Sequence, residues 1–166
     1  MLQLGYPDPT NVKPLANEFD RAFGVNITTQ TTPAVYRILQ EIKHDASLVT
    51  SSAKNYYMRT RPFVFFHQHS CTPQDEQFLK TNGSYPSGHT TIGWATALVL
   101  AEINPKRQNQ ILKRGYSFGQ SRVICGAHWQ SDVNAGRITG AALVARLHAN
   151  SQFERWIQTA KKEINE

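Results

Sequence analysis

The segment Ser84-Tyr85-Pro86-Ser87-Gly88-His89-Thr90 stands directly before the longest apolar run of the chain, residues 92–103. Ser87 is a good helix N-cap, and Gly88 lets a ligand come close to the backbone. The pattern therefore predicts a buried helix that starts at Ser87. Because the first N–H groups of a helix have no partner within it, this start is suited to binding an anion, and His89 would add a proton donor. The alternative is an ordinary capped helix with a histidine on the surface.

Composition and charge are those of a single globular domain, residues 1–166, that favours anionic partners. The chain is 40% hydrophobic, which is enough for one core, and 18 Lys+Arg against 12 Asp+Glu give a net charge of +6. Nucleic acid, an acidic membrane surface and small phosphorylated molecules all fit this charge. The run 92–103 is shorter than the about 20 residues of a membrane-spanning helix, so we expect no membrane span. No signal peptide opens the chain, which indicates a mature, trimmed or cytosolic protein.

Apolar periodicity and helix caps predict an all-α fold, a compact single-domain helical bundle. Residues 1–13 are expected to be irregular. Phe63-Val64-Phe65-Phe66 is expected to be a buried extended segment, although no partner strand is visible. The expected helices are 14–23, 33–61, 72–80, 87–103, 131–147 and 152–164, with a further one that starts at Asn104-Pro105 and includes Ile124.

Two cations precede the central segment. Lys54 and Arg61 are seven residues apart, about two helical turns, so a continuous helix would place both on one face. No acidic residue lies between them to neutralise their charge. The spacing favours an anion pocket, and the alternative is a pair of surface cations whose stems cover apolar surface.

A third group follows the central segment. His128 precedes Asp132 by four residues, so its Nδ1–H can donate to the carboxylate and leave Nε2 as a base or nucleophile. Arg122 supplies a planar guanidinium suited to phosphate oxygens. The alternative is that Asp132 only caps a helix while His128 packs beside Trp129.

The other candidate ligands give no metal site. Cys71 and Cys125 fit no metal-ligand spacing and are either free or joined in one bridge. His67 and His69 have no third ligand at a suitable spacing. We therefore expect neither a metal nor a cofactor.

Together the three groups form a tripartite pattern: Lys54-(six residues)-Arg61-Pro62, Pro86-Ser87-Gly88-His89, and Ser121-Arg122-(five residues)-His128-(three residues)-Asp132. This pattern resembles the motif of the phosphatidic-acid-phosphatase type 2 and vanadium haloperoxidase superfamily. The strings 83–90 and 119–132 look like the bacterial class A non-specific acid phosphatases in particular. The resemblance runs from about Ser52 to Leu147.

The resemblance implies a metal-independent acid phosphatase that works through a phosphohistidine. His128 would be the nucleophile, Asp132 would orient it, and His89 would be the general acid. The phosphoryl oxygens, or vanadate as their analogue, would be held by Lys54, Arg61, Ser87, Gly88 and Arg122. Small phosphorylated molecules would be the substrates and nucleic acid would not be a partner. Transfer of phosphate to alcohols or nucleosides would be a side activity, and the pH profile would be bell-shaped with an acidic optimum.

The resemblance also sets the expected context and the alternatives. It implies a periplasmic protein, a homo-oligomer, a disulfide between Cys71 and Cys125, and a chain that starts after the family's signal peptide and first N-terminal helices. One alternative is a vanadate-dependent haloperoxidase. The other is a phosphate- or polyanion-binding module without turnover.

Overall fold

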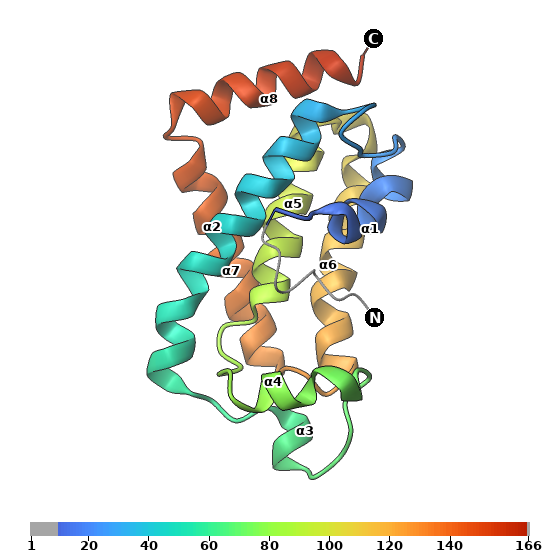
Figure 1. Cartoon of the computed structure of the whole chain (residues 1–166). Coiled ribbons are helices and arrows are strands. Elements are labelled where there is room, and N and C mark those ends of the chain that lie inside the picture. The colour runs from blue at the N-terminus through green and yellow to red at the C-terminus, as the bar shows by residue number, and fades with distance from the viewer. Residues whose placement is uncertain (1–9, 166) are drawn as a thin grey trace.

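The central element of the protein is α5 (Gly88–Ile103), around which the other long helices pack (Figure 1). This is a computed structural model, and it describes residues 10–165. Helices α2 (Pro33–Tyr57), α6 (Gln108–Ile124) and α7 (Gln130–Leu147) contact α5 directly. The remaining elements are α1 (Lys13–Phe23), α3 (Pro62–Phe65), η1 (Pro73–Asp75), α4 (Glu76–Lys80), η2 (Pro105–Arg107) and α8 (Ser151–Glu163). The described residues contain no strand, which confirms the predicted all-α bundle.

Helix α5 is central because its own side chains are buried on nearly every side. Ile92, Ala95, Val99 and Leu100 are all buried in the core. Burial of such side chains contributes about 1.5–3 kcal/mol for each large one, so the core holds the start of α5 in place. Ser87 caps this helix as predicted, since its side chain accepts a hydrogen bond from the N–H of Thr90.

A glycine brings α7 close to the start of α5. A Cβ added at Gly136 would lie 2.8 Å from the carbonyl oxygen of Ser87 and 2.8 Å from Cβ of Thr90. Only a residue without a side chain fits this approach. As a result the first turns of α5 and α7, which carry His89 and Asp132, belong to one rigid corner of the bundle.

The prediction that one helix extends from 33 to 61 is wrong at its end. Helix α2 stops at Tyr57, and Met58 adopts a left-handed conformation with φ 38°. Pro62 restricts only Arg61, which is extended with ψ 152°. The chain leaves the helix earlier because it pairs with another segment: the carbonyl of Arg59 accepts the N–H of Ser84 at 2.9 Å. Lys54 and Arg61 therefore do not share one helical face.

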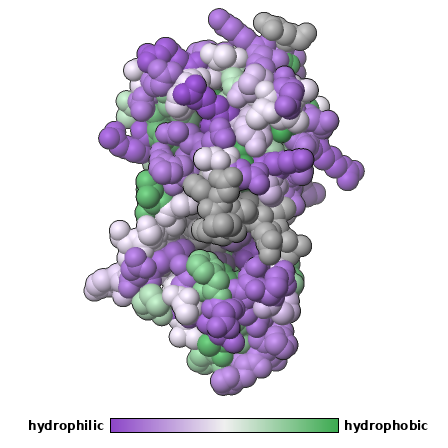
Figure 2. Space-filling model, viewed as in Figure 1, coloured by the Kyte–Doolittle hydropathy of each residue, from purple (hydrophilic) through white to green (hydrophobic). Residues whose placement is uncertain are grey.

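The predicted extended segment at Phe63–Phe66 is also wrong. Pro62 starts the short helix α3 instead, because its fixed φ suits a first helical position. Phe63 is buried, but Phe65 and Phe66 are 62% and 56% exposed. Figure 2 shows hydrophobic residues on the lower part of the viewed face, where Figure 1 places α3 and α4. The apolar run is thus partly a surface feature.

Other sequence predictions are confirmed within one or two residues. Gly24 ends α1 in a left-handed conformation with φ 86°. The helices predicted for 72–80, 87–103, 131–147 and 152–164 are present, the first of them as η1 and α4. None of the described helices combines the length and apolar character needed to cross a bilayer. The chain start on which the signal-peptide expectation depends lies outside the described residues, as does most of the segment 1–13, which the sequence predicts to be irregular.

A disulfide joins Cys71 and Cys125, as the resemblance implied. It connects the segment before η1 to the residue that ends α6, and the N–H of Cys71 also donates to the carbonyl of Cys125. Gly126 follows in a left-handed conformation with φ 68°, which turns the chain back toward α7. Both restraints lie two to three residues before His128.

Candidate active site

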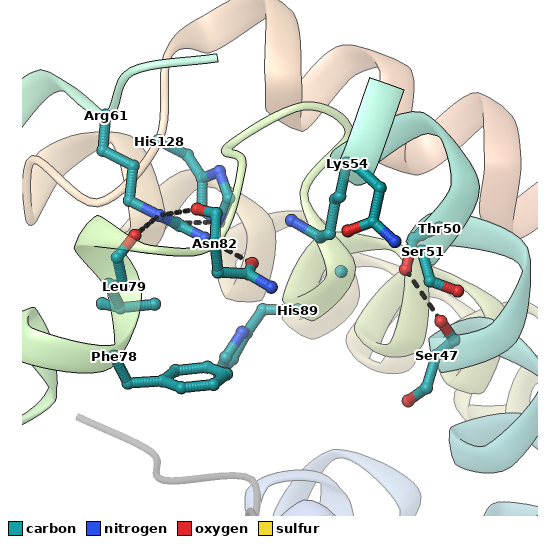
Figure 3. A pocket seen from close by; sticks show the side chains of 12 residues that line it. Ser47, Thr50, Ser51, Lys54, Arg61, Phe78, Leu79, Asn82, His89 and His128 are labelled. Carbon is teal, nitrogen blue, oxygen red and sulfur yellow. Dashed lines mark hydrogen bonds between the residues drawn. The ribbon is translucent and has the colours of Figure 1, made fainter. Parts of the chain in front are cut away.

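The three predicted segments meet at a cavity of about 220 Å³ (Figure 3). Lys54 reaches it from α2, Gly88 and His89 from the start of α5, and His128 from the turn before α7. Its lining residues are Ser47, Thr50, Ser51, Lys54, Asn55, Arg61, Phe78, Leu79, Asn82, Gly88, His89 and His128. The two histidines predicted as catalytic thus face one cavity together with two of the predicted cations.

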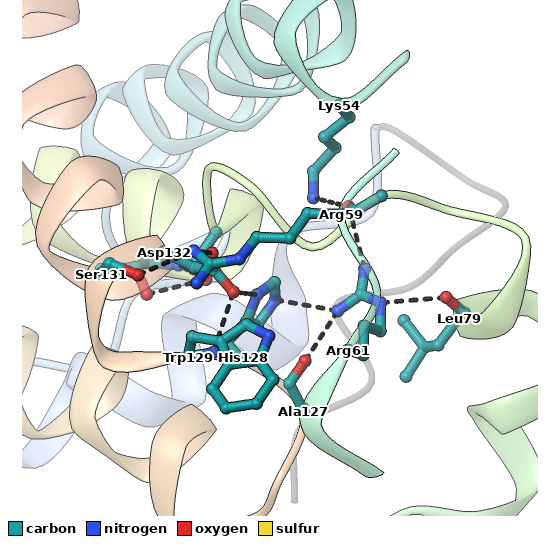
Figure 4. Close-up of polar contacts among 12 residues, drawn as sticks. Lys54, Arg59, Arg61, Leu79, Ala127, His128, Trp129, Ser131 and Asp132 are labelled. Atoms are coloured by element: carbon teal, nitrogen blue, oxygen red, sulfur yellow. Dashed lines mark hydrogen bonds and ion pairs between the residues drawn. The ribbon is translucent and has the colours of Figure 1, made fainter. Parts of the chain in front are cut away.

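His128 is buried and its tautomer follows from its neighbours (Figure 4). Nε2 lies 3.1 Å from Nη1 of Arg61, and Nδ1 lies 3.4 Å from Oδ2 of Asp132. A guanidinium can only donate, so Nε2 must accept and the ring proton must be on Nδ1. That is the tautomer in which Nε2 carries the lone pair a nucleophile needs.

Burial is the main cause that lowers the pKa of His128 to about 3. The hydrogen bond to Asp132 acts in the opposite direction, and the positive charges of Arg61, Lys54 and Arg122 lower the pKa further. The imidazole is therefore neutral at neutral and mildly acidic pH.

Asp132 is fully buried in the first turn of α7. Its Oδ2 accepts the N–H of Trp129 at 2.8 Å, and its Oδ1 forms an ion pair with Nη1 of Arg59 at 2.7 Å. Burial alone would raise the pKa of this carboxyl group, but hydrogen bonds from His128 and Trp129 outweigh it and the pKa is lowered. The carboxylate is therefore charged, and it serves both as helix cap and as partner of His128. The predicted contact between His128 and Asp132 is thus present, and the alternative in which Asp132 only caps the helix is wrong.

Two cations of the cavity are buried and held by carbonyl groups. Lys54 Nζ donates to the carbonyl of Gly83 at 2.8 Å, and burial followed by the charge of Arg61 lowers its pKa to about 7. The guanidinium of Arg61 donates to the carbonyls of Leu79 at 2.9 Å and Ala127 at 3.0 Å. Carbonyl oxygens orient these groups without cancelling their charge, so the cavity stays positive.

His89 lies between this cavity and a second one of about 270 Å³, which Arg122 lines. Arg122 is 5% exposed, its Nε is buried without a hydrogen-bond partner, and burial lowers its pKa to about 10. Burial and then the charges of Arg122, His128, Arg61 and Lys54 lower the pKa of His89 well below its usual range. Arg122 therefore lines the second cavity, whereas Lys54 lines the first, and His89 lines both.

Ser87 does not line the cavity, whereas Gly88 does. Ser87 is fully buried, and its Oγ accepts from the hydroxyl of Thr90 at 2.8 Å as well as from the N–H of that residue. Its own N–H donates to the carbonyl of Asp132 at 3.0 Å. In this arrangement Ser87 fixes the start of α5 against α7.

The sequence interpretation did not identify Arg59 and Asn82. Arg59 is the ion-pair partner of Asp132, and Asn82 Oδ1 accepts from Nη2 of Arg61 at 3.1 Å. Arg59 lies two residues before Arg61, but its role depends on the early end of α2, which periodicity did not indicate. For Asn82 we find no sequence signal beyond its place in a turn. Within residues 10–165 no group of three or more His, Cys, Asp or Glu side chains could hold a metal ion.

Comparison with known proteins agrees with this geometry. The chain is 55% identical over 151 residues to a non-specific acid phosphatase of Providencia stuartii, a match that covers 90% of the chain and 61% of the relative. It is 46% identical over 157 residues to a non-specific acid phosphatase of Salmonella typhimurium, covering 94% of the chain and 63% of the relative. The chain thus spans about three fifths of the length of these curated relatives. A model of the PAP2 superfamily matches residues 42–156, which include all three segments that meet at the cavity, so the chain belongs to the PAP2 superfamily.

Proposed function

We propose that this protein is an acid phosphatase that hydrolyses phosphate monoesters through a phosphohistidine at His128. The observation that carries the proposal is the position of His128 Nε2, which points at a buried guanidinium in a positive cavity while Asp132 holds the opposite ring nitrogen. His89 faces the same cavity and is the second group that can move a proton. The names of the relatives support phosphate esters as the substrate class.

In the first half-reaction, Nε2 of His128 attacks phosphorus and the bond between phosphorus and the ester oxygen breaks. His89 gives its proton to that oxygen, so the alcohol leaves neutral. The imidazole of His128 becomes positively charged when the P–N bond forms, and the buried carboxylate of Asp132 stabilises this charge. Lys54, Arg61 and the N–H groups at the start of α5 stabilise the negative phosphoryl oxygens.

In the second half-reaction, His89 accepts a proton from water, whose oxygen attacks phosphorus. The P–N bond breaks, His128 returns to its neutral form, and inorganic phosphate leaves. An alcohol or nucleoside hydroxyl in place of water would give phosphotransfer. The buried cations and the helix N-terminus supply the positive field that Mg²⁺ supplies in other phosphoryl-transfer sites, so we propose a metal-independent reaction.

The direction of two pKa shifts supports an acidic optimum. The free protein needs neutral His128, whose pKa is about 3, and charged Lys54, whose pKa is about 7, and His89 must carry a proton once the substrate is bound. We therefore expect kcat/KM to be highest between these values. The negative charge of a bound phosphate ester acts against the cations that lower the pKa of His89, so the substrate itself would help to protonate the general acid.

The test is hydrolysis of p-nitrophenyl phosphate at pH 5, with and without EDTA, by the wild type and by His128→Ala. We expect turnover that resists EDTA and disappears in the variant. A phosphoprotein trapped by rapid denaturation in alkaline detergent, where the P–N bond survives, and absent from His128→Ala, would support the covalent step. Turnover by His128→Ala, or a kcat/KM that keeps rising to pH 9, would contradict the assignment. Phosphate binding without turnover would favour a binding module instead.

We also propose an oxidising compartment, the periplasm, as the protein's location. The disulfide between Cys71 and Cys125 supports this, because such bonds persist outside the reducing cytoplasm. Two free thiols in protein isolated directly from the periplasm would contradict the pairing.

A further inference from the structure

Arg59 reaches Ser131 and Asp132 next to the candidate nucleophile (Figure 4), and its backbone also contacts the segment that leads into α5. It follows the end of α2, and its carbonyl accepts the N–H of Ser84, in the segment that leads into α5, at 2.9 Å. Its Nη1 lies 2.7 Å from Oγ of Ser131 and 2.7 Å from Oδ1 of Asp132, both in the first turn of α7. One residue thus connects the three parts of the tripartite motif.

The contacts of the Asp132 carboxylate divide between its two oxygens. Oδ2 accepts from Trp129 and faces His128, whereas Oδ1 contacts Arg59. The carboxylate is completely buried, but the side chain of Arg59 is 38% exposed. Arg59 therefore brings a positive charge from the surface to a buried anion. It also restricts rotation of the carboxylate, and so keeps Oδ2 aimed at His128.

Arg59 does not line the cavity in which a phosphate ester would lie. Its guanidinium instead packs over the ring of Trp129, 5.5 Å from the centroid. The ion pair with Asp132 is therefore the contact through which the charge of Arg59 reaches the partner of His128. This separates it from Arg61, which lines the cavity and contacts His128 directly.

We propose that Arg59 is a positioning residue that orients Asp132 and moderates the influence of its charge on His128. The inference rests on the proposed function, since it assigns a role within that reaction. It concerns one of the six residues between Lys54 and Arg61 that the motif leaves unspecified.

The charges around His128 give the direction of the effect. Asp132 favours the protonated imidazole, and cations oppose it. The titratable and charged groups that face His128 are Lys54 from α2, Arg61 before α3, His89 from α5, Arg122 from α6 and Asp132 from α7. Without Arg59 the carboxylate keeps its full charge next to His128, so the pKa of His128 rises. More of the nucleophile is then protonated at acidic pH, and the acid limb of the pH profile moves to higher pH.

The experiment compares the wild type with Arg59→Gln, which removes the charge, and Arg59→Lys, which keeps it. Arg155→Gln is the matched control, because Arg155 is exposed and its guanidinium hydrogen-bonds to Ser151 and Gln152 within α8. Two measurements are made: NMR titration of the His128 imidazole, and the pH dependence of kcat and KM for p-nitrophenyl phosphate. The titration does not depend on turnover, so it tests Arg59 even if the protein hydrolyses nothing.

For Arg59→Gln we expect kcat to fall about 10- to 100-fold, as for other residues that orient a catalytic side chain or a metal ligand, with KM changed less than about threefold. Both the His128 titration and the acid limb should move to higher pH. Arg59→Lys should restore their position, and Arg155→Gln should behave as wild type. The inference would be overturned if the pKa of His128 did not change in Arg59→Gln. It would also be overturned if the pKa of His128 changed as much in Arg59→Lys as in Arg59→Gln. If Arg59→Gln does not fold, the titration of Arg59→Lys decides alone, and a shift there refutes the role of charge. Loss of turnover in the wild type would instead refute the proposed function.

Discussion

Replacing Lys54 by methionine should make the protein more stable at acidic pH while it weakens phosphate binding. Lys54 is 9% exposed, and burial is the main cause that lowers its pKa from 10.5 to about 7. Each pH unit of difference is worth about 1.4 kcal/mol, so keeping this lysine charged in the folded protein costs about 5 kcal/mol. Methionine has a similar length and no charge to desolvate.

The sign depends on pH. Below pH 7 both the folded and the unfolded chain carry the charge, so the full cost is present. Between pH 7 and 10.5 only the unfolded chain holds the proton, and the wild type gains stability as pH rises. The variant also loses the hydrogen bond from Lys54 to the carbonyl of Gly83, worth about 1.5–3 kcal/mol. The net gain is about 2–3 kcal/mol at pH 5.5 and disappears by pH 9.5.

The assay is thermal unfolding at pH 5.5 and pH 9.5, with and without 10 mM phosphate (about that concentration suffices if Kd is near millimolar). At pH 5.5 the variant should melt about 5–10 °C above the wild type, because about 1 kcal/mol shifts Tm by about 2–4 °C at this size. Phosphate should raise the Tm of the wild type more than that of the variant. Lys80→Met, at an exposed position of α4, is the control and should change little. The reasoning would be refuted if the Tm of the variant at pH 5.5 were equal to or below that of the wild type. It would also be refuted if the difference in Tm were the same at both pH values.

Three further substitutions test the rest of the site and the fold. Asp132→Asn should lower kcat by about 10³–10⁴-fold while inorganic phosphate still inhibits, and a fall of less than tenfold would contradict its role. Changing Cys71 and Cys125 together to serine should lower the free energy of unfolding in urea by up to about 4 kcal/mol, because the bridge closes a loop with a sequence separation of 54. An unchanged free energy of unfolding would show that the bridge does not restrain the unfolded chain. Gly115→Ala should lower the free energy of unfolding by about 1–3 kcal/mol in the same assay with an unchanged KM, since the new Cβ would lie 2.3 Å from Cβ of Ala97. An unchanged free energy of unfolding would mean that α5 and α6 separate easily.

The sequence predicted the fold class and the central helix because their signals are local. A capping serine, a long apolar run and a helix-ending glycine act within a few residues, so the bounds of α1, α5 and α7 agree with the predictions. The same reasoning failed at the end of α2. There the helix stops four residues early because Arg59 pairs with Ser84, which is 25 positions away in the chain. No periodic pattern can indicate a contact of that kind.

The site was predicted as a set of residues but not as a geometry. Motif spacing identified the nucleophile candidate, its carboxylate and the cations. Of the eight predicted residues, six line the two cavities: His89, which lines both, and Lys54, Arg61, Gly88, Arg122 and His128. Spacing did not indicate that Arg61 would contact Nε2 of His128, or that Ser87 would be committed to Thr90 and Asp132. These contacts join segments whose relative position is set only when the whole bundle packs.

The balance of charge in the site explains why its stability and its proposed chemistry oppose each other. Lys54, Arg61 and Arg122 are all buried near two imidazoles whose pKa values are lowered, and the carboxylate that contacts His128, Asp132, is already paired with Arg59. Burial lowers the pKa of Lys54 and of Arg122, so holding these charges inside the protein disfavours folding. A phosphate ester brings negative charge to these cations. A transition state with more charge on its oxygens interacts with them more strongly. The core around α5 provides the stability that lets the protein hold these cations in place before any substrate arrives.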